Sequence, residues 1–222
     1  MASLLGRAEP LDLVQSHIIQ EELLFKCSEV ARLLPIYRQT VSELLRRRPG
    51  LVLVLPTIDL VADPVDEATR RWPAAVTIVR GPAEKFAAFA ASDVALAASG
   101  TVLLELAMAE LPAVVAYKMN PLTGWLARRL VESRFVNLVN IILDRPVVPE
   151  LLLEECTSNR LSSALEDLLG NAASRATQIA GYRESLARLG QGGIAPSLRA
   201  ADDVLAVVRG PGSATCSLIE RH

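Results

Sequence analysis

The residues best suited to chemistry form a short stretch, Ser99-Gly100-Thr101 followed by Glu105, directly after an apolar run. Gly100 lets backbone approach a ligand closely, and the free N–H groups of a first helical turn attract an anion, to which Ser99 or Thr101 can donate a hydroxyl. Glu105 lies one helical turn past Thr101, so the two share a face, and its carboxylate can accept both hydroxyls of a ribose. A phosphate beside a ribose predicts a nucleotide site.

The same stretch also fits an ordinary strand-to-helix turn. In that interpretation a serine caps the helix and the helix dipole favours the glutamate. Three small residues and a glutamate are less specific than a P-loop, so the spacing by itself leaves both interpretations open.

The elements that must position these residues are predicted from four apolar runs that alternate with helical patterns. Such alternation is typical of an α/β fold with a parallel sheet covered on both faces. The predicted strands are 51–55, 75–79, 94–98 and 113–117, and the predicted helices between or before them are 29–48, 64–71, 83–91 and 101–110. Right-handed crossovers then give a doubly wound, Rossmann-like layer, whose ligands bind beyond the carboxyl ends of the strands. Lys118 ends a strand at that edge, where it either adds positive charge near a phosphate or is a solvated surface lysine.

After Tyr117 the sequence becomes helical in pattern. The predicted helices there are 121–133, 148–155, 158–169, 172–189 and 196–208. We therefore expect four regions: an atypical helical leader at 1–27, a nucleotide-binding domain at 28–189, a C-terminal helix at 190–208 after a Gly/Pro hinge, and a disordered tail at 209–222.

Composition limits the classes of function. The 222 residues are 51% hydrophobic with a net charge of −2, which fits a globular domain and argues against nucleic acid as a partner. The three cysteines, Cys27, Cys156 and Cys216, follow no metal or redox spacing, and neither His17 nor His222 belongs to a catalytic cluster. No signal peptide and no apolar run of about 18 residues is present, so a cytoplasmic protein is expected.

Two long segments carry a resemblance to a known family. Residues 92–131, SDVALAASGTVLLELAMAELPAVVAYKMNPLTGWLARRLV, and 135–156, FVNLVNIILDRPVVPELLLEEC, resemble the lipid-A-disaccharide synthases, and the similarity extends from about Ser28 to about Val207. The resemblance implies the second, UDP-holding domain of a GT-B type glycosyltransferase. It places Ser99, Gly100 and Thr101 at the diphosphate and Glu105 at the ribose. Asn140 would line the same cleft, although it also fits a simple loop-forming asparagine.

The family's reaction is a step of lipid A, and hence lipopolysaccharide, biosynthesis in the Gram-negative bacterial envelope. The resemblance implies transfer of 2,3-diacylglucosamine from its UDP derivative to 2,3-diacylglucosamine 1-phosphate, with release of UDP. No cofactor is implied, and no metal is expected because the chain has no Asp-x-Asp motif. The family's general base lies in a preceding domain, so no catalytic residue is expected in this chain.

The sequence departs from the family at two places. Val139 replaces a proline beside Asn140, and Leu24, Phe25 and Lys26 replace a Gly-Ser-Arg loop. Leucine lacks the backbone freedom of glycine, and lysine cannot bind a phosphate in the bidentate manner of arginine. The leader therefore looks foreign to the family, which suggests either a truncated or mis-started reading frame or a genuine short protein.

Other functions and partners stay open. A non-catalytic UDP-binding or oligomerisation module is the main alternative, and nothing points to the carboxylates of a UDP-sugar epimerase. Trp125, Leu126 and Leu130, beside the pair Arg128-Arg129, form an amphipathic stretch that either packs in the core or touches the inner membrane peripherally. Exchange of C-terminal helices in a homodimer is a further expectation.

Overall fold

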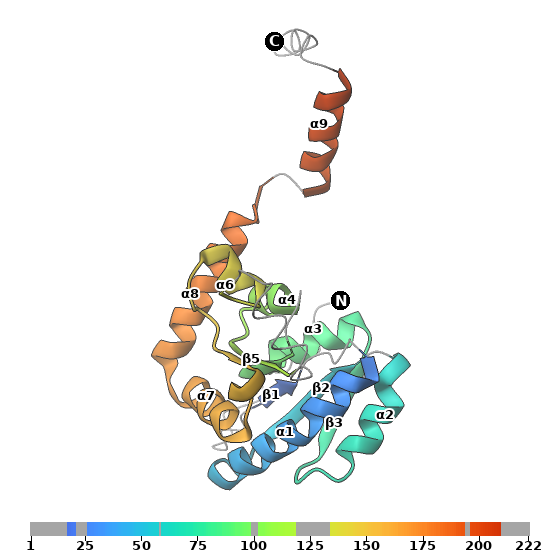
Figure 1. The fold of residues 1–222 in the computed structure, drawn as a ribbon, viewed down its shortest axis with the longest axis vertical. Coiled ribbons are helices and arrows are strands. Elements are labelled where there is room, and N and C mark those ends of the chain that lie inside the picture. Colours follow the sequence, from blue (N-terminus) through green and yellow to red (C-terminus); the bar gives the residue numbers. More distant parts are fainter. Residues whose placement is uncertain are drawn as a thin grey trace, which may run out of the picture. The chain divides into compact units, whose positions relative to one another are not determined.

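The computed structural model of the chain describes residues 17–20, 26–57, 59–98, 102–118, 134–193 and 196–209. It divides into two compact units, Met1–Ser185 and Leu186–His222. The first holds the sheet, shown in Figure 1. The second includes a turn in which Gly190 and Gly192 have positive φ, and the helix α9, Pro196–Arg209. The predicted helix at 121–133 and the predicted tail after 209 lie outside the described residues.

The first unit is built on a six-stranded sheet in the order β3-β2-β1-β4-β5-β6, and every pair of neighbours is parallel. The strands are β1, His17–Gln20; β2, Val52–Thr57; β3, Val76–Arg80; β4, Val94–Ala97; β5, Ala113–Tyr117; and β6, Glu150–Leu152. This order is that of a doubly wound nucleotide-binding layer. The predicted α/β class and the four predicted strands are confirmed.

The strand β1 corrects the helical interpretation of residues 1–27. Over His17–Gln20 that interpretation is wrong, because these residues form a strand that pairs with β2 on one side and β4 on the other. The β-branched pair Ile18-Ile19 suits such a position, whereas the helical spacing of apolar residues around it reflected only a local pattern. Residues 1–16 and 21–25 lie outside the described part of the chain.

The helices of the first unit connect these strands. They are α1, Lys26–Arg47; α2, Asp59–Thr69; α3, Pro82–Ala91; α4, Val102–Met108; α6, Leu138–Leu143; α7, Ser158–Gly170; and α8, Ala172–Arg188, which ends in the second unit. The helices predicted at 29–48, 83–91, 101–110, 158–169 and 172–189 are confirmed. The helix predicted at 64–71 begins earlier, at Asp59.

The helix predicted at 148–155 is wrong. Glu150–Leu152 forms the edge strand β6, and a 3₁₀ turn, η1, occupies Leu153–Glu155. Glutamate and leucine favour helices in isolation, but here Glu150 pairs with Val115 and Leu151 with Ala116 of β5. The ladder with a neighbouring strand therefore overrides the local preference.

The main core lies between the sheet and the helices α1 and α7, which run side by side in Figure 1. Leu33 and Leu44 of α1, Leu55 of β2 and Leu165 of α7 are each at most 1% exposed. Burial of one such side chain stabilises the fold by about 1.5–3 kcal/mol. This packing fixes the sheet, whose carboxyl edge carries the predicted site.

Candidate functional site

The strand order creates a topological switch point between β1 and β4. From β1 the chain runs outward to β2 and β3, whereas from β4 it runs the other way to β5 and β6. Helices that follow diverging strands lie on opposite faces, so a crevice opens at the carboxyl ends of the two central strands. The predicted site stretch begins two residues after β4 ends at Ala97. The end of β4 and the start of α4, which flank this stretch, therefore lie where such sheets bind ligands.

Ser99, Gly100 and Thr101 lie outside the described residues. The elements on either side of them are described: β4 is buried along its whole length, and α4 begins at Val102. The connection between a buried strand and a helix is thus confirmed, whereas the contacts of the three residues stay a prediction.

Glu105 lies in the first turn of α4 and is paired with a lysine that the sequence reasoning missed. The Lys85 ammonium, from α3, donates to Glu105 Oε2 at 2.7 Å. The lysine side chain is 15% exposed and the glutamate side chain 34%. The sequence gives no indication of this pair, because Lys85 precedes Glu105 by 20 residues and lies on a different helix.

Lys118 follows directly after β5, at the same edge of the sheet as the end of β4. It is half-buried, and its ammonium lies close enough to Cys156 to influence the thiol. Burial raises the pKa of the Cys156 thiol, and the positive charge of Lys118 opposes that rise only in part. Lys118 therefore places a positive charge beside the carboxyl end of β5, and its contact with a phosphate stays a prediction.

Asn140, in α6, is 1% exposed and bonds to backbone. Its Oδ1 accepts from the backbone N–H groups of Val147 and Val148 at 2.8 and 2.9 Å, and its Nδ2 donates to the Val148 carbonyl at 2.9 Å. These contacts match the alternative interpretation of Asn140 as a residue that shapes a loop. Its predicted contact with a nucleotide is not tested by them and stays a prediction.

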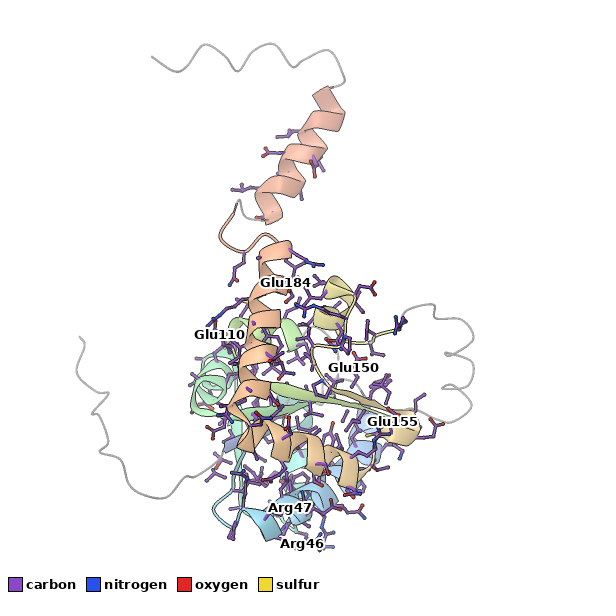
Figure 2. The ribbon with its side chains drawn as sticks, turned by 90° about the vertical axis from the view of Figure 1, so that its left-hand side faces the viewer. Arg46, Arg47, Glu110, Glu150, Glu155 and Glu184 are labelled. Carbon is purple, nitrogen blue, oxygen red and sulfur yellow. The ribbon has the colours of Figure 1, made fainter. Side chains whose placement is uncertain are left out.

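The segment before β6 is held by a second buried asparagine. Asn137 caps α6 by accepting from the Asn140 N–H, and its Nδ2 donates to Glu150 Oε1 at 2.6 Å. Glu150 also accepts from the backbone N–H groups of Val136 and Asn137. Figure 2 shows Glu150 among the sticks of this segment. The polar network therefore ties residues 136–148 to the sheet edge, next to β5.

A surface hollow lies elsewhere, at the amino-terminal edge of the sheet. Glu43 and Arg46 of α1, Pro49 before β2, Pro73 before β3 and Ser158 of α7 line it. Figure 2 shows Arg46 at this end of α1. Loops at the amino ends of strands do not form the crevice in which doubly wound sheets bind nucleotides. This hollow therefore differs from the predicted site, which is expected at the carboxyl edge.

Two kinds of site are absent from the described part of the chain. No three His, Cys, Asp or Glu side chains gather there in a way that could hold a metal ion. None of the helices within it is both long and apolar enough to cross a membrane.

Solved structures with a similar fold include sugar-processing enzymes. The calicheamicin glycosyltransferase CalG4 matches with a TM-score of 0.55 and 16% identity over 93% of this chain and 46% of its own. A UDP co-structure of S. aureus MnaA matches with a TM-score of 0.53 and 14% identity over 76% of this chain and 40% of its own. UDP-N-acetylglucosamine 2-epimerases also match. The likeness establishes a Rossmann-like domain of the GT-B type and leaves the chemistry to other observations.

Similarity in sequence identifies the family of the chain, which similarity in fold does not. The lipid-A-disaccharide synthase of Paramagnetospirillum magneticum is 50% identical over 184 residues, which are 82% of this chain and 47% of that protein. The synthase of Rhodospirillum centenum is 50% identical over 181 residues, 82% of this chain and 45% of that protein. The chain thus spans about half the length of the curated relatives it matches. The profile of the lipid-A-disaccharide synthetase family matches residues 23–196. The chain belongs to the lipid-A-disaccharide synthetase family.

Proposed function

We propose that this chain binds UDP-2,3-diacylglucosamine as the donor-binding half of a lipid-A-disaccharide synthase. The sugar passes to 2,3-diacylglucosamine 1-phosphate, and UDP leaves. The observation that carries the proposal is the position of the Ser99–Glu105 stretch, after β4 at the switch point of the parallel sheet, in a chain of this family.

The residues of this chain act on the leaving-group side of the reaction. Ser99, Gly100 and Thr101 bind the diphosphate through backbone N–H groups and hydroxyls, and Glu105 accepts the ribose hydroxyls. Lys118 adds positive charge at the same edge, where negative charge develops on the departing UDP. Fixed donors and charges stabilise that developing charge without reorganisation, and this lowers the barrier to transfer.

The acceptor side is proposed to lie in the part of the relatives that this chain does not match. Transfer requires an acceptor hydroxyl that a general base deprotonates and that is held close to the anomeric carbon of the sugar. Asn140 contributes by holding the 144–148 loop, and through it the segment next to β5. Its direct contact with the nucleotide is a further, separate part of the proposal.

Titration with UDP tests the site. The unaltered chain is expected to bind UDP, and Glu105→Gln is expected to weaken binding by about tenfold or more, because one neutral amide oxygen replaces two charged oxygens as the acceptor for the ribose hydroxyls. The exposed carboxylate Glu67 on α2 supplies the control, and Glu67→Gln should leave the affinity unchanged. Absence of UDP binding by the unaltered chain would refute the site.

Turnover distinguishes the two functions proposed for the site. The purified chain is mixed with both acylated substrates, and disaccharide is followed by chromatography. Binding of UDP without any disaccharide favours the non-catalytic UDP-binding module for this chain by itself. Formation of disaccharide would show that the general base lies within these 222 residues.

The acylated substrates also suggest where the protein works. We propose a cytoplasmic protein that contacts the inner membrane peripherally, since the acyl chains of both substrates partition into a bilayer. Co-sedimentation with vesicles that contain anionic lipid measures this contact. Homodimer formation is proposed as well, and light scattering after size exclusion measures it.

A further inference from the structure

The ion pair between Lys85 and Glu105 joins two helices that both begin at the carboxyl edge of the sheet. The helix α3 follows β3 and carries Lys85, and the helix α4 follows β4 and carries Glu105. The lysine Nζ lies 2.7 Å from Glu105 Oε2. The carboxylate of the proposed ribose site therefore forms an ion pair with Lys85, which the Ser99–Glu105 motif does not predict.

The ammonium of Lys85 is held more firmly than in an ordinary surface pair. Its side chain is 15% exposed. Its Nζ lies 5.4 Å from the centroid of the Phe86 ring and 6.0 Å from that of Phe89. Phe89 is itself 1% exposed and packs edge-to-face against Phe86 at 5.6 Å. Aromatic faces attract a cation, and burial makes the carboxylate partner more important to it. The two rings and the carboxylate thus hold the Lys85 ammonium in one position beside Glu105.

In this arrangement one oxygen of the Glu105 carboxylate, Oε1, is left to bind a ligand. The hydrogen bond from Lys85 reaches Oε2, and no described residue donates a hydrogen bond to Oε1. Glu105 is 34% exposed. A charge-assisted hydrogen bond to one oxygen restricts the rotation of the carboxylate, while the other oxygen can still accept.

We infer that Lys85 is the positioning residue of the ribose site: it holds the Glu105 carboxylate so that its free oxygen meets the ribose hydroxyls. Lys85 itself does not touch the nucleotide. This inference rests on the proposed function, because it takes the ribose contact of Glu105 as given. A carboxylate without this cation would sample several rotamers and would lose orientation before binding.

The test compares UDP with 2′-deoxy-UDP, since the two differ by one hydroxyl of the ribose. Calorimetric titration is expected to show that the unaltered chain prefers UDP by about tenfold or more. Both Glu105→Gln and Lys85→Met should reduce the preference to less than about threefold. The double variant should lose no more than either single variant, because both changes remove one coupled interaction.

A matched control removes a positive charge from the same edge without touching Glu105. Arg80 ends β3 and pairs with Asp59 and Asp63. Arg80→Met is expected to change the affinities for UDP and 2′-deoxy-UDP by the same factor, so that their ratio stays as in the unaltered chain. Lys85→Arg retains a cationic donor and should keep most of the preference, which also covers the case in which Lys85→Met fails to fold.

Three results would overturn the inference. Tighter UDP binding by Lys85→Met would show that the lysine competes with the ribose. An unchanged ratio in Lys85→Met, with only a lower melting temperature, would show that the pair merely joins α3 to α4. Equal loss of the preference in Lys85→Arg would show that a cation at this position is not sufficient. Failure of the proposed function looks different: the unaltered chain then binds no UDP, or Glu105→Gln leaves the ratio unchanged.

Discussion

Among single residues, Tyr37 shows how the core tolerates an unused polar group. Its side chain is fully buried in α1, and its hydroxyl has no hydrogen-bond partner among the described residues. Burial is the main cause that raises the pKa of this phenol, and the neighbouring Cys156 adds to it. The ring therefore contributes apolar packing, whereas the hydroxyl carries an uncompensated cost of desolvation.

We predict that Tyr37→Phe stabilises the protein. Removal of a buried hydroxyl without a partner should raise the free energy of unfolding by about 1 kcal/mol, because the desolvation cost disappears while the ring stays. Urea denaturation followed by circular dichroism measures the change. A fall in the midpoint would mean that the hydroxyl has a partner in solution.

Glu43 links α1 to α7 and gives stability a dependence on pH. Its carboxylate accepts from Ser162 at 2.6 Å and from Ser158 at 2.9 Å. The hydrogen bond from Ser162 is the largest cause that lowers the pKa of Glu43 below its ordinary value of 4.5, and the Ser158 bond and nearby arginines lower it further. A group whose folded pKa is lowered stabilises the fold above its ordinary pKa, and the effect is lost as the pH falls.

The corresponding prediction concerns Glu43→Gln. This variant should melt at a lower temperature than the unaltered chain at pH 7. The difference should shrink as the pH falls below 4.5, where protonation makes the two side chains alike. Thermal melts at a series of pH values measure it. A difference that stays constant down to pH 3 would contradict the assigned cause.

At the scale of elements, a few buried amide side chains join helices and loops to the edge of the sheet. Gln178 of α8 bonds to both the N–H and the carbonyl of Ala113, at the start of β5. Asn137 and Asn140 do the same for the segment before β6. Buried backbone groups need partners, so these amides allow loops to lie against the sheet.

Asn140→Ala is predicted to lower the free energy of unfolding by about 3 kcal/mol. The substitution leaves two backbone N–H groups and one carbonyl without their buried partner, and each such group costs about 1–3 kcal/mol before relaxation. Chemical denaturation measures the loss, and Asn159→Ala on the exposed side of α7 is the control. A UDP titration of the folded variant then decides whether Asn140 also contacts the nucleotide.

For the molecule as a whole, the division into two units makes a prediction about truncation. The sheet and most of its helical residues belong to Met1–Ser185, whereas the last residues of α8 and the helix α9 lie in Leu186–His222. A chain that ends after Gly193 keeps all of α8 and is expected to bind UDP with unchanged affinity, because each unit has its own internal packing. Calorimetry on the shortened chain checks this. A loss of affinity greater than about threefold would show that the second unit contributes to the site.

Local sequence patterns predicted much of this fold and the candidate site. Strands such as Val94–Ala97 are apolar throughout because both of their faces are covered, and helices such as Lys26–Arg47 show helical spacing because one face is buried. The Ser99–Glu105 stretch could be proposed as a site from the sequence because its residues are close together along the chain.

The strands β1 and β6 and the partner of Glu105 required the tertiary structure. Ile18 becomes a strand residue because it lies between β2 and β4, and Leu151 because it pairs with Ala116. Lys85 meets Glu105 only when α3 and α4 lie together on the folded sheet. The sequence by itself determined the class of fold, the family and the motif, because these depend on local order along the chain. Only the tertiary structure decided which distant residues meet, since such contacts depend on how the elements pack.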